Sequence, residues 1–109
     1  MSSAVVAAED KCLYDAPVRI EWDPAKNEAN LGAHGVGFAE AATVLEDERA
    51  LTREDPGASG EQRFVSLGTS GLGNLLVVVY AYREPDRRRM ISAWKANRHQ
   101  RVLYEKARR

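Results

Sequence analysis

Arginine residues stand at the ends of three segments that have the composition of β-strands. Arg63 begins one segment, Arg83 ends the most apolar one, and Arg89 begins the next. The guanidinium group is planar, keeps its charge, and can bind two oxygens of one phosphate group. Glu61 precedes Arg63 by two residues, so the two side chains would share one face of a strand. Glu61 could orient the guanidinium group or act as a base, or the two could form a surface ion pair worth about 0–1 kcal/mol.

The charges of the chain are distributed unevenly along its length. The 109 residues contain 16 Lys and Arg against 16 Asp and Glu, so the formal net charge is zero. Residues 1–60 nevertheless contain five basic and twelve acidic residues, whereas residues 83–109 contain ten basic and three acidic residues. Such an asymmetry indicates a nucleic-acid partner or an acidic partner protein.

The residues that build metal centres or covalent active sites are scarce. The chain has one cysteine, Cys12, and two histidines, His34 and His99. These are too few for a zinc site or a nucleophilic triad, so we expect neither a metal nor another cofactor. The glycines at 71 and 73 lie between two predicted strands, which is typical of a hairpin turn and not of a phosphate-binding loop.

The first half of the chain predicts one strand and two helices. Residues 18–22 alternate apolar with polar side chains, as in a half-buried strand. Asp23 and Pro24 favour a helix start, and Gly35 can end that helix after His34. An apolar stripe at helical spacing predicts a second helix, with the inward residues Phe38, Ala41, Ala42 and Leu45.

The second half predicts four strands and a final helix. The strands are expected near residues 50–52, 62–68, 75–83 and 89–95. In a regular last strand, one face would carry Met90, Ser92 and Trp94, and the other face would carry Arg89, Ile91, Ala93 and Lys95. Asn97 is a good N-cap for the final helix, whose inner side we expect to carry Val102, Leu103 and Ala107.

This order of elements predicts a single α+β domain over residues 18–109, with helices on one face of a largely antiparallel sheet. Residues 1–17 show no periodicity and are interpreted as a flexible leader. The longest apolar run, Leu75–Ala81, is too short to cross a membrane. The absence of a secretory signal pattern and the single cysteine favour a cytoplasmic location.

Several blocks of the sequence together resemble one known family. They are EWDPAK (21–26), Asn30, AHGVGFAEAATVLED (33–47), GEQRFVSLG (60–68), LLVVVYAYR (75–83) and RMISAWKANRHQRVLYE (89–105). Their order and spacing are similar to those of the BrnT family, bacterial toxins of type II toxin–antitoxin systems. The agreement of several separate blocks makes the resemblance more specific than any single motif.

The resemblance implies a RelE-like fold and a ribonuclease that inhibits translation, either on the ribosome or independently of it. It also implies neutralisation by a BrnA-like antitoxin, a ribbon-helix-helix protein. In that family the two proteins form a heterotetramer that represses its own operon, so operator DNA would be contacted only through the antitoxin.

The resemblance also suggests roles for individual residues. A metal-independent ribonuclease needs a base for the 2′-OH, positive charge for the transition state, and an acid for the leaving oxygen. By analogy, Arg63, Arg83 and Arg89 are predicted to contact the phosphate, although each could instead be a solvated strand end. The base is predicted to be one of Glu61, His34 or Tyr80. The residues predicted to contact RNA are Lys95, Trp94 and Arg98.

Two of these candidates have structural alternatives. His34 lies in the last turn of a predicted helix, where a capping or packing role is the favoured interpretation. Tyr80 and Tyr82 share a face of the central strand, where they could stack on nucleobases or pack in the core. Packing is expected for at least one of them.

The chain departs from the family pattern at three positions. The family typically has ISAR where this chain has ISAW, ending at Trp94, and it tends to have Thr and Glu at positions 97 and 100. An indole ring can stack on a base, but it offers a phosphate only one N–H donor. Two hypotheses therefore stand: an active endoribonuclease, or a weakened toxin-like subunit that mainly binds the antitoxin and helps to regulate its operon. A third is nucleic-acid binding through the basic final helix.

Overall fold

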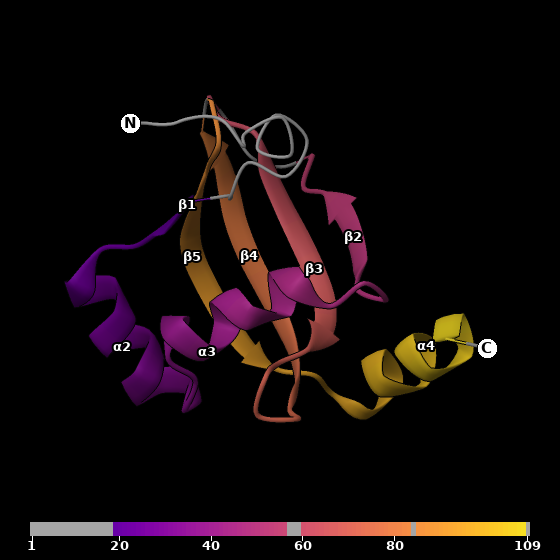
Figure 1. The fold of residues 1–109 in the computed structure, drawn as a ribbon. Helices are drawn as coiled ribbons and strands as arrows, with labels where there is room; N and C mark the ends of the chain where they lie inside the picture. The colour runs from indigo at the N-terminus through magenta and orange to yellow at the C-terminus, as the bar shows by residue number, and fades with distance from the viewer. Residues whose placement is uncertain (1–18, 57–59, 84, 109) are drawn as a thin grey trace, which may run out of the picture.

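The structure is a computed structural model, and it describes residues 19–56, 60–83 and 85–108. The predicted leader over residues 1–17 lies outside the described residues. A strongly twisted sheet forms the centre of the molecule, with helices packed around it (Figure 1). Among the described residues, no helix is both long enough and apolar enough to cross a membrane.

The elements follow the order that the sequence predicts. The first half forms β1 (Arg19–Glu21), α2 (Pro24–His34), α3 (Phe38–Thr43) and a short 3-10 helix, η1 (Val44–Glu46). The second half forms β2 (Leu51–Glu54), β3 (Arg63–Thr69), β4 (Leu75–Arg83), β5 (Arg87–Lys95) and α4 (Arg98–Arg108). The predicted α+β class is confirmed.

The five strands form one sheet in the order β1-β5-β4-β3-β2. Strands β2 to β5 are a continuous antiparallel meander, as predicted. Strand β1 joins the sheet beside β5 and runs parallel to it. The first and the last strand of the chain are therefore neighbours, which brings the N-terminal acidic half against the C-terminal basic half.

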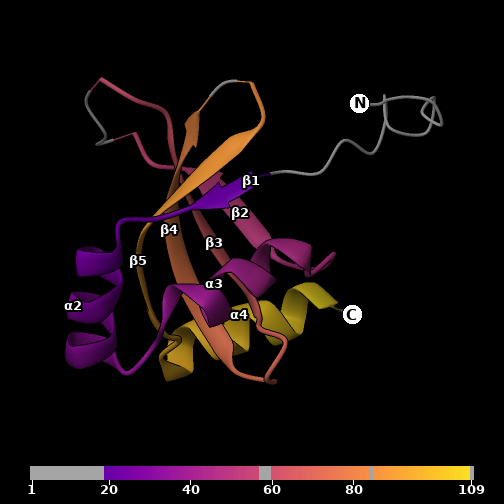
Figure 2. The same ribbon diagram turned by 60° about the vertical axis from the view of Figure 1, so that its left-hand side comes forward.

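Alternate residues of β4 define the two faces of the sheet. The face that carries Leu76, Val78 and Tyr80 is here called the core face, because Phe38, Ala41 and Val44 of α3 and η1 pack on it. The face that carries Val77, Val79 and Ala81 is here called the arginine face. Helix α3 crosses the core face of the sheet (Figures 1 and 2).

The predicted boundaries of the first helix are confirmed in atomic detail. The Asp23 carboxylate accepts a hydrogen bond of 2.9 Å from the Ala25 N–H, and Pro24 occupies the first turn. Gly35 ends the helix with φ of 72°, and its N–H donates to the Leu31 carbonyl. Only glycine adopts this left-handed conformation without steric cost.

Asn30 of α2 attaches that helix to the sheet. Its amide nitrogen donates to the carbonyls of Ala93 (2.8 Å) and Val36 (2.9 Å). Its amide oxygen accepts from the Ala93 N–H (3.2 Å) and from the Ser92 hydroxyl (3.1 Å). Because β1 pairs only with residues 87–89 of β5, the Asn30 amide takes the place of a neighbouring peptide group along the rest of that edge.

A β-bulge in β5 changes the predicted orientation of its side chains. Val79 pairs with Ser92, but the next residue, Tyr80, pairs with Met90, so Ile91 is an extra residue. The prediction that Trp94 and Arg89 lie on opposite faces is therefore wrong. The insertion of one residue reverses the alternation, and both side chains belong to the arginine face.

Helix α4 contradicts the prediction that all helices lie on one face of the sheet. Its residues Gln100 and Leu103 line a groove together with Val65, Leu67 and Val77, which belong to the arginine face. The predicted inner residues are also wrong. Val102 and Leu103 are each 48% exposed and Ala107 is exposed, whereas Tyr104 is the buried residue of this helix.

The hydroxyl of the buried Tyr104 makes polar contacts with two distant segments. Its hydroxyl donates to the Asp47 carboxylate at 2.5 Å and accepts from the Thr69 hydroxyl at 3.2 Å. Burial alone would raise the pKa of Asp47. Hydrogen bonds from the Thr69 N–H, the Tyr104 hydroxyl and the Arg49 N–H, together with the Arg49 charge, outweigh burial and hold that pKa below its ordinary value.

Two side chains fix the start of α4. The Asn97 side chain accepts from the Gln100 N–H, and the Gln100 side chain accepts from the Asn97 N–H, each at 2.8 Å. This reciprocal pair is a capping box. Asn97 and Gln100 therefore satisfy two backbone N–H groups of the first turn of α4.

Candidate active site

The strand register brings two of the predicted arginines to one line across the sheet. Ala81 of β4 pairs with Arg63 of β3 on one side and with Arg89 of β5 on the other. Neighbouring strands lie about 4.8 Å apart, so the two arginine backbones are separated by roughly 10 Å. The residue between them, Ala81, has only a methyl side chain and is fully buried.

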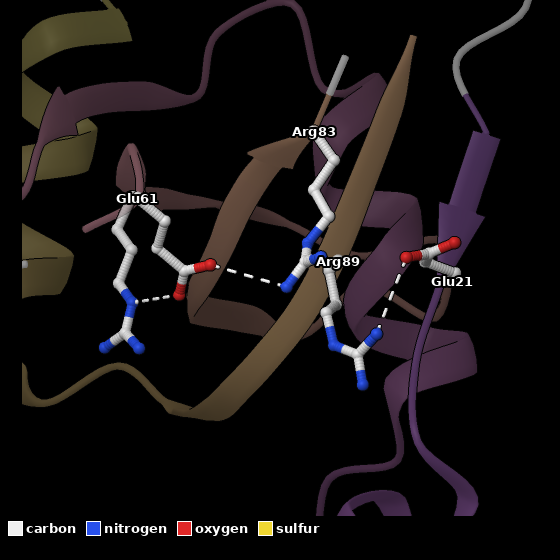
Figure 3. Close-up of polar contacts among 5 residues, drawn as sticks. Glu21, Glu61, Arg83 and Arg89 are labelled. Carbon is white, nitrogen blue, oxygen red and sulfur yellow. Dashed lines mark hydrogen bonds and ion pairs between the residues drawn. The ribbon is translucent and has the colours of Figure 1, made fainter. Parts of the chain in front are cut away.

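Arg83 and Glu61 complete this line. Glu61 contacts Arg63 at 2.9 Å through one carboxylate oxygen and Arg83 at 3.5 Å through the other. Arg83 and Arg89 occupy diagonal positions of β4 and β5, and their side chains extend into the space between the two glutamates shown in Figure 3. We call Arg63, Arg83, Arg89, Glu61 and Glu21 the arginine cluster.

Glu21 is a site residue that the sequence did not reveal. On β1 it pairs with Arg89, and its carboxylate lies 3.6 Å from the Arg89 guanidinium group (Figure 3). A second contact joins it to Arg87 at 3.8 Å. The alternation of residues 18–22 placed Glu21 on the polar side of its strand. The parallel pairing of β1 with β5, which has no local sequence signal, decides its partner.

The arginine cluster is open to solvent and carries excess positive charge. The side chains of Arg63, Arg83 and Arg89 are 38%, 44% and 34% exposed. Ion pairs at such exposure contribute about 0–1 kcal/mol each, so an incoming anion can replace them at little cost. Three guanidinium groups and two carboxylates therefore form a site that can bind a phosphodiester and also offers it a base.

The three consecutive arginines of β5 do not act on one surface. Arg87 and Arg89 face the arginine cluster, whereas Arg88 pairs with Tyr82 and lies on the other side of the sheet. Its guanidinium carbon is 4.5 Å from the centre of the Tyr82 ring, in a cation–π contact. The Arg88 guanidinium group thus already covers the Tyr82 ring, which disfavours the predicted stacking of a nucleobase on it.

Tyr80 lies away from the arginine cluster. It is 7% exposed on the core face, where its ring stacks on Phe64 at 5.8 Å between centroids. Its hydroxyl is 3.1 Å from the Ser66 hydroxyl. This position favours the alternative of core packing over a role as the catalytic base.

The remaining candidates gather near the far end of β5. Trp94 pairs with Val77, four residues along β4 from Ala81, which corresponds to about 13 Å. The His34 ring lies 6.1 Å from the Trp94 ring and not beside the arginines. Lys95 pairs with Leu76 and thus belongs to the opposite face from Trp94, and Arg98 is an exposed residue at the start of α4.

Metal-binding side chains are not clustered in the described part of the chain. Across residues 19–56, 60–83 and 85–108, no group of three or more His, Cys, Asp or Glu side chains is arranged to hold a metal ion.

Comparisons with known proteins identify the family and the fold. Residues 22–100 match the family described as "Ribonuclease toxin, BrnT, of type II toxin-antitoxin system". The fold is similar to the crystal structure of the Brucella abortus ribonuclease toxin BrnT, with a TM-score of 0.58 and 21% identity over 75% of this chain and 100% of the other. No curated protein sequence matches the chain. The family match spans most of the chain, which therefore belongs to the BrnT family of ribonuclease toxins of type II toxin–antitoxin systems.

Proposed function

We propose that this chain is a metal-independent endoribonuclease that cleaves RNA and thereby inhibits translation. The observation that carries the proposal is the arginine cluster, in which Arg63, Arg83 and Arg89 share one open face and Glu61 contacts two of them. The family is one of ribonuclease toxins. The cluster supplies the positive charge and the carboxylate that phosphodiester cleavage requires.

In this mechanism the scissile phosphate binds between Arg63 and Arg89, above Ala81. Its oxygens replace the carboxylate contacts of the guanidinium groups, and Glu61 is thereby freed from Arg63 and Arg83. The freed carboxylate accepts the proton of the 2′-OH, whose oxygen then attacks phosphorus. The products are a 2′,3′-cyclic phosphate and a 5′-hydroxyl end, with the leaving oxygen protonated from solvent.

The arginines stabilise the transition state more than the bound substrate. Negative charge on the equatorial oxygens grows as the pentavalent phosphorus forms, and the fixed guanidinium groups face it without rearranging. Glu21 is a positioning residue, because its contacts with Arg87 and Arg89 hold the latter against the strand. Removal of one of the guanidinium groups that face the phosphate is expected to lower the rate of cleavage by about 10²- to 10³-fold.

We favour the active enzyme over a weakened subunit. The arginine cluster contains all three predicted arginines, and Trp94 stands about 13 Å along β4 from its centre. The tryptophan therefore changes the surroundings of the cluster and leaves its cations in place.

The experiment is cleavage of a labelled single-stranded RNA by the purified chain, with and without EDTA. We expect cleavage that resists EDTA and yields cyclic phosphate ends. Arg89→Ala and Glu61→Gln should each reduce the rate at least about 100-fold. Arg49→Ala, an exposed arginine outside the cluster, is the matched control. Full activity of the Arg89 and Glu61 variants would contradict the proposal, and so would cleavage that EDTA abolishes.

Translation arrest needs a test in cells. Induction of the chain without a partner should stop growth and protein synthesis, and Arg89→Ala should restore both. Growth arrest that persists in the Arg89 variant would show that RNA cleavage at the cluster is not its cause.

We also propose a docking surface for a BrnA-like antitoxin in the groove between α4 and the arginine face. The groove has a volume of about 330 Å³, and its apolar lining comes from Leu51, Val65, Leu67, Val77 and Leu103. Arg53 lies at this groove, and the exposed residues Arg98, Arg101 and Lys106 lie along α4. An apolar segment with acidic flanks would complement this surface, and it would lie on the same face as the arginine cluster.

Co-expression with a BrnA-like protein tests this surface. Leu103→Asp should abolish co-purification, because it places a charge in the apolar groove, while RNA cleavage by the variant alone should persist. Light scattering of the wild-type complex should give the mass of a heterotetramer. Unchanged co-purification of the Leu103 variant would place the antitoxin elsewhere.

A further inference from the structure

Two aromatic rings on this chain have no part in the proposed cleavage step. The rings of Trp94 and His34 lie 6.1 Å apart between centroids, and their planes are inclined at 48°. His34 is exposed in the last turn of α2, and Trp94 is half-buried near the end of β5. They come from segments sixty residues apart, so tertiary structure alone creates the pair.

The bulge at Ile91 places this pair on the side of the sheet that carries the arginine cluster. Without the extra residue, Trp94 would face away from Arg89. With it, an RNA strand that lies across Arg89 and continues along β5 meets the indole ring about 13 Å farther on. A nucleotide close to the scissile phosphate can therefore contact Trp94 while the phosphate occupies the cluster.

A hollow lies beside His34 along α2. It has a volume of about 320 Å³, and its lining residues include Ala29, Ala33, His34 and Lys26. The two alanines leave room for a flat group. Lys26 is exposed and lies eight residues before His34, which is about 12 Å along the helix. A hollow with two alanines between His34 and Lys26 fits a nucleobase together with its adjoining phosphate, and the His34 ring joins it to Trp94.

We propose that Trp94 and His34 form a stacking site for one unpaired nucleobase of the RNA substrate, with Lys26 beside the next phosphate. This inference rests on the proposed ribonuclease function. Each nucleobase has a π face, so aromatic stacking tolerates any base and holds a single strand in place. The site therefore acts on substrate affinity, and the chemical step remains with the arginine cluster.

The binding test uses hexanucleotide RNAs with 2′-O-methyl sugars, which lack the attacking hydroxyl and cannot be cleaved by this mechanism. Tryptophan fluorescence should fall when the probe binds the wild-type chain. Trp94→Ala should weaken binding about tenfold, whereas Trp94→Phe should retain most of the affinity. His34→Ala should weaken binding severalfold. Trp22→Phe, which changes the core tryptophan packed on Phe38, is the control and should leave affinity unchanged.

A probe that lacks one base sharpens the test. Removal of the base at a single position should weaken wild-type binding about as much as Trp94→Ala does, and the variant should not distinguish the two probes. With cleavable RNA, Trp94→Ala should raise KM and leave kcat within about twofold of wild type. Equal affinities of wild type and Trp94→Ala for the intact probe would overturn the stacking site.

The outcomes separate this inference from the proposed function. If Arg89→Ala abolishes cleavage and Trp94→Ala changes neither KM nor probe affinity, the function stands and the stacking site is overturned. If the wild-type chain does not cleave RNA, the uncleavable probe still reports whether Trp94 stacks on a base. A fall in kcat at unchanged KM in Trp94→Ala would also overturn the site.

Discussion

The two faces of the sheet differ in what their side chains do. On the core face, Leu76, Val78 and Met90 are almost fully buried beneath Phe38 and its neighbours on α3. On the arginine face, the same strands present Arg63, Arg83 and Arg89 to solvent, and α4 packs near the other end. The core face buries apolar side chains away from water, whereas the arginine face exposes charged side chains to it.

Because the proposed catalytic residues lie on the face opposite the core, a small domain can carry them without weakening its fold. Successive residues of a strand point to opposite faces, so β4 supplies Tyr80 to the core and Ala81 to the floor of the site. The arginine contacts are exposed and contribute little to stability. Stability and catalysis should therefore respond to different substitutions.

The largest effect should come from the core face. Phe38 is fully buried and packs edge-on against Trp22 at 6.2 Å between centroids. Phe38→Ala should lower the free energy of unfolding by about 3–5 kcal/mol, because it removes buried apolar area and leaves a cavity. Urea unfolding followed by fluorescence measures it. Leu72→Ala, in an exposed turn, is the control, and a loss below about 1 kcal/mol in the Phe38 variant would contradict this account.

A substitution on the arginine face should lower the rate of RNA cleavage and leave the free energy of unfolding nearly unchanged. Arg63→Ala should lower the rate of RNA cleavage by about 10²- to 10³-fold, equivalent to about 3–4 kcal/mol in the transition state. Its free energy of unfolding should stay within about 1 kcal/mol of wild type, since the pair with Glu61 is exposed. If Arg63→Ala lowers both the free energy of unfolding and the rate of RNA cleavage, stability and catalysis do not depend on separate faces of the sheet.

Asn30 lies at the boundary between the two faces. Asn30→Ala should lower the free energy of unfolding by about 2–3 kcal/mol, because the peptide groups of Ala93 and the Val36 carbonyl lose their partner. Hydrogen exchange at Ala93 should accelerate. Glu28→Ala, on an exposed side of α2, is the control. Unaltered exchange at Ala93 would mean that the edge of β5 does not depend on the amide.

The smallest effect should depend on pH and concern the anchor of α4. The pKa of Asp47 lies below its ordinary value of 3.8, because its hydrogen bonds and the Arg49 charge outweigh burial. The stability that this carboxylate contributes is thus fully present above pH 3.8 and lost as the pH falls through the lower folded value.

Asp47→Asn should therefore cost about 1–2 kcal/mol at pH 7 and less at pH 3, which lies below the ordinary pKa of 3.8. Unfolding of wild type and variant at both pH values measures the difference. Glu48→Gln, on an exposed neighbour, is the control substitution at both pH values. An equal cost of the Asp47 substitution at the two pH values would contradict the assigned role of its charge.

The sequence was sufficient where the signal is local. Asp23, Pro24 and Gly35 define α2 because capping depends on the residues at the helix ends themselves. The apolar stripe predicted Phe38 and Ala41 as core residues, and the run Leu75–Ala81 was enough to predict the central strand; Val44, which is fully buried, lay outside the predicted stripe. The α+β order and the antiparallel meander followed from these elements.

The predictions that failed required contacts between distant segments. Ile91 has no property that marks it as a bulge, so the alternation of β5 was assigned without it. Val102 and Leu103 look like inward residues of α4, yet Tyr104 is buried because Asp47 and Thr69 lie where its hydroxyl can bond. Glu21 was missed because parallel pairing of β1 with β5 joins the two ends of the domain.

By itself, the sequence determined the class of fold, the caps, the central strand and the set of arginines, since each depends on residue type and short-range spacing. Tertiary structure alone decided which of these arginines meet. The strand register sets Arg63 and Arg89 on either side of Ala81, and the bulge turns Trp94 to the same face as Arg89. A shift of one residue in pairing exchanges the two faces of a strand, and no local property of the chain specifies that shift.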